Sequence, residues 1–198
     1  MLVAIDDSKS MSSTSVSAFA LESLALVCNA MAKLEISDMG VVRFGGEGGA
    51  ELLHAFETPF SGEVGGEIVG KMRFDADNTI DDRPIVDLLE FVSGLERPEG
   101  VKQLVIIMGD GRFHEREALR KAVMDVSGDP SVMYAFVILG SGVLEMQTVE
   151  FVDGKPVFAR YVDGFPFGLY VVVGEVRDLV WGLGAVVRGW MERVCGGG

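Results

Sequence analysis

The stretch LVAIDDSKSM, residues 2–11, opens with four apolar residues and continues with two carboxylates, a lysine and two hydroxyl side chains. A short apolar run of this kind is typical of a strand that is covered on both faces of a sheet. Residues 12–33 then carry apolar side chains at the spacing of a helix, from Val16 to Met31. The chain therefore passes from a buried strand into a helix through a polar turn, and the side chains of that turn are candidates for a functional site.

The rest of the chain continues this alternation. Strands are expected at 39–44, 51–56, 101–108, 132–139 and 169–173. Amphipathic helices are expected at about 83–95, 114–126 and 175–194. Two hairpins are predicted, one through the loop GGEGG at 45–49 and one that joins 148–152 to 156–161 through the turn DGK. The polar, glycine-rich residues 58–69 are expected to form a surface loop.

Apolar strands that alternate with helices predict an α/β fold with a mostly parallel central sheet and helices on both faces. Because crossovers between parallel strands are right-handed, the sheet is expected to be doubly wound and Rossmann-like, with the hairpin at 148–161 as an insertion. We expect a single domain over residues 1–195. The three glycines at 196–198 look like a linker or the remnant of an engineered sequence, and both ends look like cuts made in a longer protein.

Composition narrows the classes of function. Hydrophobic residues make up 48% of the 198 residues, which is enough to fill a core and argues against disorder. With 30 acidic and 17 basic residues the formal net charge is −13, which disfavours binding to nucleic acid and anionic membranes and favours binding to metal ions and basic proteins.

Cys28 and Cys195 lie in no CxxC or similar spacing, which indicates a reducing compartment and argues against both a disulfide scaffold and a zinc site. No apolar run is expected to reach the ~20 residues of a membrane span, and the N-terminus does not look like a signal peptide.

Polar side chains gather at the carboxyl ends of the expected strands. Asp6, Ser8 and Ser10 follow the first strand at intervals of two residues, so in an extended turn their side chains can face one point. Asp110 follows the central apolar strand, and Thr79 lies in a loop that precedes a helix. Ligands of doubly wound sheets bind at this edge. All five side chains offer oxygen, which Mg²⁺ prefers and which Mn²⁺ and Ca²⁺ also accept.

Two interpretations of these residues compete. Ser8 and Ser10 are also suited to cap the helix that follows them, and Thr79 to cap the helix that begins near Arg83. Their combination with Asp110 and with the order of the strands favours the metal. If the hydroxyls bind the ion directly and the carboxylates bind it through water, the ion keeps net positive charge. Such a site attracts a carboxylate from another molecule, so it suits binding better than a closed structural role.

The residues DDSKS at 6–10 match the DxSxS motif of von Willebrand factor A-type domains, and the chain resembles this family in element order over nearly its whole length. The resemblance implies a metal-ion-dependent adhesion site (MIDAS) with five ligands: Asp6, Ser8, Ser10, Thr79 and Asp110. The family usually has a serine just before the strand-end aspartate, whereas this chain has Gly109. A hydrogen bond that supports the ligands is therefore expected to be missing.

Three segments resemble, more narrowly, the domain of this family at the C-terminus of a giant AAA ATPase of 60S ribosome assembly: AIDDSKSM (4–11), VVRFGG (41–46) and YVDGFPFGLYVVV (161–173). The resemblance implies that the domain grips a ubiquitin-like domain of a WD-repeat pre-60S assembly factor in the nucleus. An acidic side chain of that factor would complete the Mg²⁺ coordination, and the distant motor would pull the factor off the pre-ribosome.

The hairpin at 148–161 is expected to add partner contacts. Side chains beside the ligands are expected to touch the partner, with an ordinary surface or loop role as the alternative: Lys9, Asp77, Asn78, Arg112 and Phe113.

An enzyme is the rival interpretation. An aspartate at the end of the first strand and another acid after a central strand also describe aspartate-nucleophile phosphatases. That chemistry needs a second carboxylate two residues after the first, where this chain has Ser8. The sequence contains neither GxSxG nor GxxxxGK[ST]. We therefore expect that the domain itself is not an enzyme, with a Mg²⁺-dependent phosphatase as the alternative.

Four further side chains have simpler expected roles. Asp7 is expected to be solvated or to support the site from outside the ligand set. His54 and His114 do not lie in a ligand spacing, and His114 is expected on the surface or at the start of a helix. Phe165 is expected to pack in a turn or in the core.

Overall fold

The computed structural model describes residues 1–34, 38–76 and 82–195. Its central sheet has six strands: β1 (Leu2–Asp6), β2 (Gly40–Gly46), β3 (Gly49–His54), β4 (Gln103–Gly109), β5 (Val132–Leu139) and β8 (Tyr170–Val173). They lie in the order β3-β2-β1-β4-β5-β8, and every neighbouring pair is parallel except β2 with β3. The mostly parallel sheet that the sequence predicts is confirmed.

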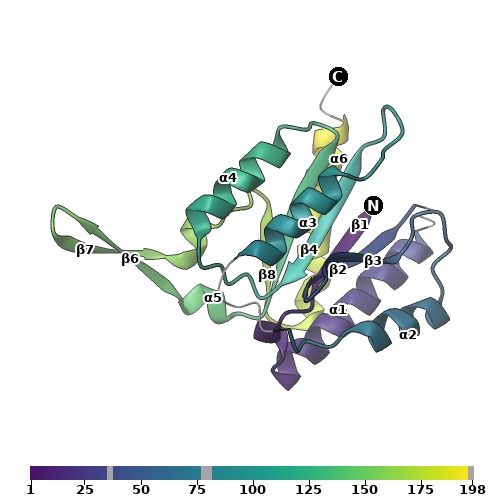
Figure 1. Ribbon diagram of the computed structural model, residues 1–198, viewed down its shortest axis with the longest axis horizontal. Coiled ribbons are helices and arrows are strands. Elements are labelled where there is room, and N and C mark those ends of the chain that lie inside the picture. The colour runs from purple at the N-terminus through teal and green to yellow at the C-terminus, as the bar shows by residue number, and fades with distance from the viewer. Residues whose placement is uncertain (35–37, 77–81, 196–198) are drawn as a thin grey trace.

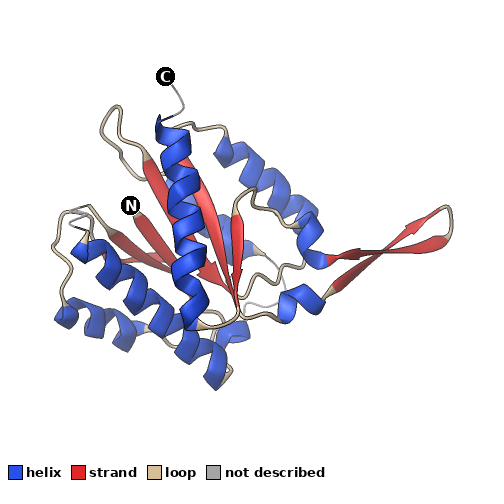
Figure 2. Ribbon diagram, turned by 180° about the vertical axis from the view of Figure 1, so that it is seen from behind, coloured by secondary structure: helices blue, strands red, loops and turns tan. Residues whose placement is uncertain are grey.

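Helices cover both faces of this sheet. They are α1 (Thr14–Lys33), α2 (Gly62–Lys71), α3 (Arg83–Ser93), α4 (Arg116–Ser127), the one-turn α5 (Gly142–Glu145) and α6 (Val176–Cys195), with the 3-10 helices η1 (Lys9–Met11) and η2 (Tyr161–Gly164). α3 and α4 pack on the face seen in Figure 1, whereas α1, α2 and α6 pack on the face seen in Figure 2. The strand order reverses between β1 and β4, because the chain builds outward from β1 to β3 and from β4 to β8. The carboxyl ends of these two strands are therefore where a doubly wound sheet binds its ligands.

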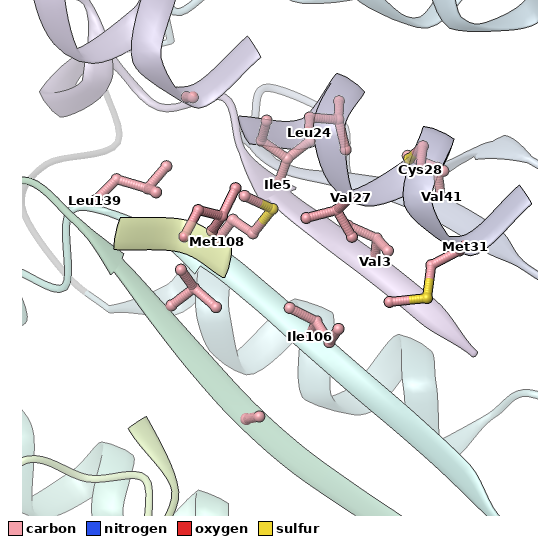
Figure 3. Packing of buried hydrophobic residues seen from close by; sticks show 14 of the residues in the cluster. Val3, Ile5, Leu24, Val27, Cys28, Met31, Val41, Ile106, Met108 and Leu139 are labelled. Carbon is pink, nitrogen blue, oxygen red and sulfur yellow. The ribbon is translucent and has the colours of Figure 1, made fainter. Parts of the chain in front are cut away.

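The core lies on both sides of the sheet because successive side chains of a strand point to opposite faces. In β1, Val3 and Ile5 belong to the cluster beneath α1, whereas Leu2 and Ala4 belong to the cluster beneath α3, and all four are fully buried. Figure 3 shows the first cluster, in which side chains of α1 meet those of β1 and β4. This two-sided burial explains why the strand reads as an unbroken apolar run.

α1 corrects one expectation from the sequence. Its segment Ser15–Lys33 is long and apolar enough to cross a membrane by length and composition, with a mean hydropathy of 1.5. In the fold, however, Leu24, Val27 and Met31 pack against the sheet (Figure 3). Of the apolar window in this segment 33% is buried, so α1 packs one face on the sheet and leaves much of the rest exposed or partly exposed.

α2 lies where the sequence predicts a loop, so that prediction is wrong. The four glycines of this ten-residue helix disfavour a helix. Packing overrides them, because Val64 and Ile68 lie one turn apart and join the core cluster beneath α1. Ser61 caps the helix, since its hydroxyl accepts a hydrogen bond from the backbone N–H of Val64 at 3.3 Å.

The second predicted hairpin is confirmed. β6 (Gln147–Val152) and β7 (Lys155–Arg160) form a separate antiparallel pair that projects from the body of the domain (Figures 1 and 2). Asp153 and Gly154 both have positive φ, 51° and 76°, as the tight two-residue turn of a hairpin requires. Every residue of β7 is exposed. The hairpin is thus an arm outside the main sheet.

Candidate metal site

Two carboxylates meet where the strand order reverses. Asp6 is the last residue of β1, and Asp110 directly follows β4, the strand that pairs with β1 on the side away from β2. Together with Ser8 and Ser10 they line a pocket of about 400 Å³. The other residues that line this pocket are Phe44, Asp82, Pro84, Ile85, Arg112, Phe113, His114 and Met146. The structure therefore brings together four of the five side chains that the sequence predicts, and the fifth, Thr79, lies outside the described residues.

The polar turn after β1 is folded so that its hydroxyls converge. The Asp6 carboxylate accepts a hydrogen bond from the backbone N–H of Ser8 at 2.9 Å, and the hydroxyl oxygens of Ser8 and Ser10 lie 2.9 Å apart. The N-cap residues of η1 and α1 are Ser8 and Ser13, and neither side chain makes a capping hydrogen bond within the described part of the chain. The capping interpretation of Ser8 and Ser10 therefore has no support, and their hydroxyls face the pocket instead.

Asp110 carries a buried oxygen that no described group satisfies. The side chain is only 8% exposed, and its Oδ1 accepts a hydrogen bond from the backbone N–H of Arg112 at 3.0 Å. Its Oδ2 has no hydrogen-bond partner among the residues that the structure describes. Leaving a buried acceptor unpaired costs on the order of 1–3 kcal/mol, and more if it is charged. A site that tolerates this cost is suited to a ligand that supplies the missing partner.

Asp6 shows the same need for a positive partner. Burial raises the pKa of its carboxyl to about 7, and the nearby carboxylates of Asp110 and Asp7 raise this pKa further, while hydrogen bonds from Ser8 oppose the shift. Desolvation and like charges disfavour the ionised form, and a cation in the pocket would favour it. The carboxylates of Asp6 and Asp110 thus lie close enough to repel each other, and a divalent cation bound between them would relieve this repulsion.

These residues fit a hard divalent cation. Two carboxylates and two hydroxyls offer only oxygen, the donor that Mg²⁺, Mn²⁺ and Ca²⁺ accept. Within 1–34, 38–76 and 82–195, no group of three or more His, Cys, Asp or Glu side chains is placed to hold a metal. A site here therefore depends on serine hydroxyls as much as on carboxylates, which leaves a bound ion under-neutralised.

Gly45 lets β2 pass directly beside the ligands, a role that the sequence did not reveal. Its φ is +86°, and a Cβ at this position would lie 2.7 Å from an oxygen of Asp6 and 2.9 Å from the backbone nitrogen of Ser8. Gly109 is also close, since a Cβ there would lie 3.1 Å from the second oxygen of Asp6. The departure from the family serine at 109 thus matches a tight contact with the Asp6 carboxylate.

Replacing Gly45 with alanine is expected to weaken Mn²⁺ binding about tenfold or more, because the new methyl group displaces Asp6 and forces an unfavourable φ. Gly46→Ala is the matched control, since a Cβ at Gly46 would meet no atom within 4 Å. Titration of each variant with Mn²⁺, followed by the electron paramagnetic resonance signal of free Mn²⁺, measures the difference. Equal dissociation constants for the two variants would contradict the assigned role of Gly45.

Asp7 is buried rather than solvated, which leaves the second of its two expected roles, support of the site from outside the ligand set. It is 2% exposed, and its Oδ1 accepts hydrogen bonds from the backbone N–H groups of Arg73 and Phe74 at 2.8 and 2.7 Å. The guanidinium of Arg43 lies 3.5 Å from its other oxygen. Asp7 therefore fixes the segment that leads from α2 toward Thr79 and lies outside the ligand set.

Asp82 organises the opposite wall of the pocket and was also missed. This buried carboxylate accepts hydrogen bonds from the backbone N–H groups of His114 and Glu115 at 2.9 and 2.7 Å. It also occupies the N-cap position of α3, so the interpretation of Thr79 as that cap is wrong. A carboxylate that holds the backbone of a distant loop leaves no signal in periodicity or spacing.

The remaining predicted residues divide between the rim and the interior. Lys9 and Arg112 are exposed beside the ligands. The ring of Phe113 lines the pocket but also packs in an aromatic cluster, 5.6 Å from Phe136 and 5.5 Å from Phe165 between ring centres. The expected core packing of Phe165 is confirmed.

Two predicted partner contacts, Asp77 and Asn78, lie outside the described residues. His114 is exposed as expected, at the start of the segment that leads into α4. His54 is buried, with its ring edge-on to that of Phe60 at 5.7 Å.

The chain is similar in sequence to known proteins. No family model matches the chain. The sequence is similar to midasin from Dictyostelium discoideum, with 28% identity over 201 residues that cover 97% of this chain and 3% of that protein. It is also similar to midasin from Giardia intestinalis, with 26% identity over 204 residues that cover 98% of this chain and 4% of that protein. The chain therefore spans only a few per cent of the length of these relatives.

Solved structures show the same fold. The SpRpn10 VWA domain superposes with a TM-score of 0.61 at 10% identity, covering 90% of this chain and 92% of that one. Proximal thread matrix protein 1 from the mussel byssus, with a zinc-occupied MIDAS motif, also gives a TM-score of 0.61, at 14% identity, covering 94% of this chain and 46% of that one. These likenesses show the fold, and the second shows that a MIDAS motif on this fold holds a divalent metal.

Proposed function

We propose that this chain, a von Willebrand factor A-type domain similar to part of midasin, is a metal-dependent protein-binding module. The observation that carries the proposal is the buried, unpartnered Oδ2 of Asp110 in a pocket that also exposes the Ser8 and Ser10 hydroxyls. Nothing in this donor set completes a coordination shell by itself. The pocket is open to the outside, so another molecule can contribute the remaining donor.

The residues in and around the pocket have two different roles in such a site. Asp6, Ser8, Ser10 and Asp110 would hold the cation, with Thr79 as the ligand from the loop that precedes α3. When bound, a divalent cation supplies positive charge and a free coordination position that attracts a carboxylate. The carboxylates of Asp7 and Asp82 keep the two neighbouring backbone segments in place.

We further propose that the partner is a ubiquitin-like domain of a WD-repeat factor of 60S ribosome assembly, which lends a Glu or Asp to Mg²⁺. The support is the likeness to midasin along nearly the whole chain, together with the three segments that resemble the C-terminal domain of the assembly ATPase. In this proposal the domain acts in the nucleus as one part of a longer ATPase, and pulling through it removes the bound factor.

The projecting hairpin offers a second contact surface for the same partner. Val149 and Phe158 pair across its strands and are 48% and 63% exposed. Phe158→Asp is therefore expected to weaken partner binding about tenfold, because an exposed aromatic anchor is lost, while Mn²⁺ binding stays unchanged. Calorimetric titration with the ubiquitin-like domain measures the first effect and titration with Mn²⁺ the second. An unchanged partner affinity would remove the hairpin from the interface.

The phosphatase alternative finds little support in the geometry. Position 8 carries a serine, and the carboxylate next to Asp6 in the sequence, that of Asp7, already accepts two backbone hydrogen bonds away from the pocket. It is therefore not placed to act as a general acid for a phosphate bound at Asp6.

One pair of measurements separates the two functions. A binding module should lose its partner when EDTA removes the metal and should not hydrolyse an aryl phosphate in Mg²⁺. Turnover of the aryl phosphate that disappears in Asp6→Ala would favour the enzyme.

A further inference from the structure

The loop that follows Asp110 is held almost entirely by side chains. Four successive backbone N–H groups, those of residues 112–115, donate in turn to Asp110 Oδ1 at 3.0 Å, to the Tyr161 hydroxyl at 2.6 Å and to the two carboxylate oxygens of Asp82 at 2.9 and 2.7 Å. Because two of these partners, Tyr161 in η2 and Asp82 at the start of α3, come from elsewhere in the fold, the conformation of this loop depends on where those two elements lie. The loop begins at a proposed metal ligand, so this dependence reaches the site.

Tyr161 connects the two ends of the turn in this loop. Its side chain is buried, at 4% exposure, and its hydroxyl both accepts from the N–H of Phe113 and donates to the carbonyl of Gly111 at 3.0 Å. One hydroxyl thus bridges the two ends of the turn that directly follows Asp110. Gly111 has a φ of +69°, and a Cβ there would lie 3.1 Å from Ile138, so the turn is also pressed against β5.

Tyr161 is itself fixed by its surroundings. The guanidinium of Arg116 lies 4.8 Å from the centre of its ring and donates to its carbonyl oxygen at 3.0 Å. Its backbone N–H donates to the carbonyl of Met146 at 3.0 Å, and this hydrogen bond closes the base of hairpin β6–β7. Met146 in turn lines the metal pocket. The base of the projecting arm and the Asp110 loop are therefore joined through a single residue.

We infer that Tyr161 is a positioning residue for the metal site, which holds the Asp110 loop in its binding conformation and couples that loop to the hairpin. The inference rests on the proposed function, because it concerns the same metal. It implies that a force or a contact on the hairpin changes the position of Asp110. Binding at Asp110 should in turn make the base of the hairpin more rigid.

Tyr161→Phe tests the positioning role with the smallest change. The ring and its contact with Arg116 remain, but the turn loses the group that bridges Gly111 and Phe113. Tyr170→Phe is the matched control, because the Tyr170 hydroxyl donates to the carbonyl of Val162 at 3.0 Å in the same region and does not touch the Asp110 loop. Titration with Mn²⁺ at a temperature well below both melting points should show about 10- to 100-fold weaker binding for Tyr161→Phe and less than about twofold change for Tyr170→Phe.

The outcomes distinguish this inference from the proposed function. If the wild-type domain does not bind Mn²⁺, the proposed function fails and the inference fails with it. If the wild type binds Mn²⁺ and both tyrosine variants bind it equally well, the site stands but the positioning role is wrong. A lower melting temperature for both variants with unchanged Mn²⁺ affinity would leave Tyr161 with a structural role alone and would likewise overturn the inference.

Hydrogen–deuterium exchange tests the coupling in the wild-type protein, where folding of a variant is not in question. Saturation with Mg²⁺ should slow exchange of the Phe113 and Tyr161 amides, because ordering of the loop is passed to the base of the hairpin. In metal-free Tyr161→Phe the Phe113 amide should exchange faster than in the wild type. Protection by Mg²⁺ that stops at Phe113 and leaves the Tyr161 amide unchanged would contradict the coupling.

Discussion

Asp110→Ala is expected to abolish metal-dependent partner binding, with at least about a hundredfold loss of affinity for both Mn²⁺ and the partner. The substitution removes the buried carboxylate whose Oδ2 has no other described partner. Without it the proposed ligands are the carboxylate of Asp6 and the hydroxyls of Ser8, Ser10 and Thr79, which together carry too little negative charge to hold a divalent ion against water. Asp6→Ala and Thr79→Ala should have the same effect. Chelation of the metal from the wild type should reproduce it, and added Mg²⁺ should restore binding to the wild type only.

Stability separates this loss of function from unfolding. In EDTA, the free energy of unfolding of Asp110→Ala should lie within about 1 kcal/mol of the wild type, because the lost hydrogen bond from Arg112 is offset by removal of a desolvated oxygen and of repulsion with Asp6. Asp125→Ala, an exposed substitution on α4, controls for the loss of one negative charge. Calorimetric titration with the ubiquitin-like domain and urea denaturation give the two quantities. Retention of partner binding by Asp110→Ala in EDTA would show that the interface does not use the metal.

The elements that could be predicted from the sequence are those whose local pattern and burial agree. β5 was predicted with both of its boundaries, because eight apolar residues in a row are explained by a central strand covered on both faces. The site followed from the fold, since Asp6 and Asp110 end neighbouring parallel strands and must therefore meet. The local sequence pattern gave a wrong prediction for α2. Its glycines predict a loop, but two apolar residues pack against the core and stabilise a helix.

The parts of the site that could not be predicted are the side chains that bind distant backbone. Asp82 reaches a loop 32 residues away, and the Tyr161 hydroxyl reaches one 48 residues away. Neither contact has a periodicity or a motif, because hydrogen bonds to a backbone N–H do not depend on which residue carries it. Sequence alone thus identifies the atoms proposed to touch the metal, and the structure identifies the atoms that hold those ligands in place.

Asp7→Ala is expected to lower the free energy of unfolding by about 2–5 kcal/mol, the range in which loss of a buried hydrogen-bond network falls. The substitution leaves the buried N–H group of Phe74 and the partly buried N–H group of Arg73 without their acceptor. Phe74 has a φ of +54°, an uncommon conformation for a bulky residue, and relaxation of this strain in the variant would offset part of the loss. Arg43 would lose one of its charged neighbours as well.

Two variants define what this prediction measures. Asp7→Asn keeps one acceptor oxygen without the charge and should be destabilised less than Asp7→Ala, whereas Asp75→Ala removes the same charge from an exposed position in the same segment and should change stability by less than about 0.5 kcal/mol. Urea denaturation in EDTA excludes any contribution from metal binding. Because the segment that Asp7 holds leads to Thr79, a stability of Asp7→Ala equal to that of Asp75→Ala would mean that this ligand loop is kept in place by contacts other than the Asp7 carboxylate.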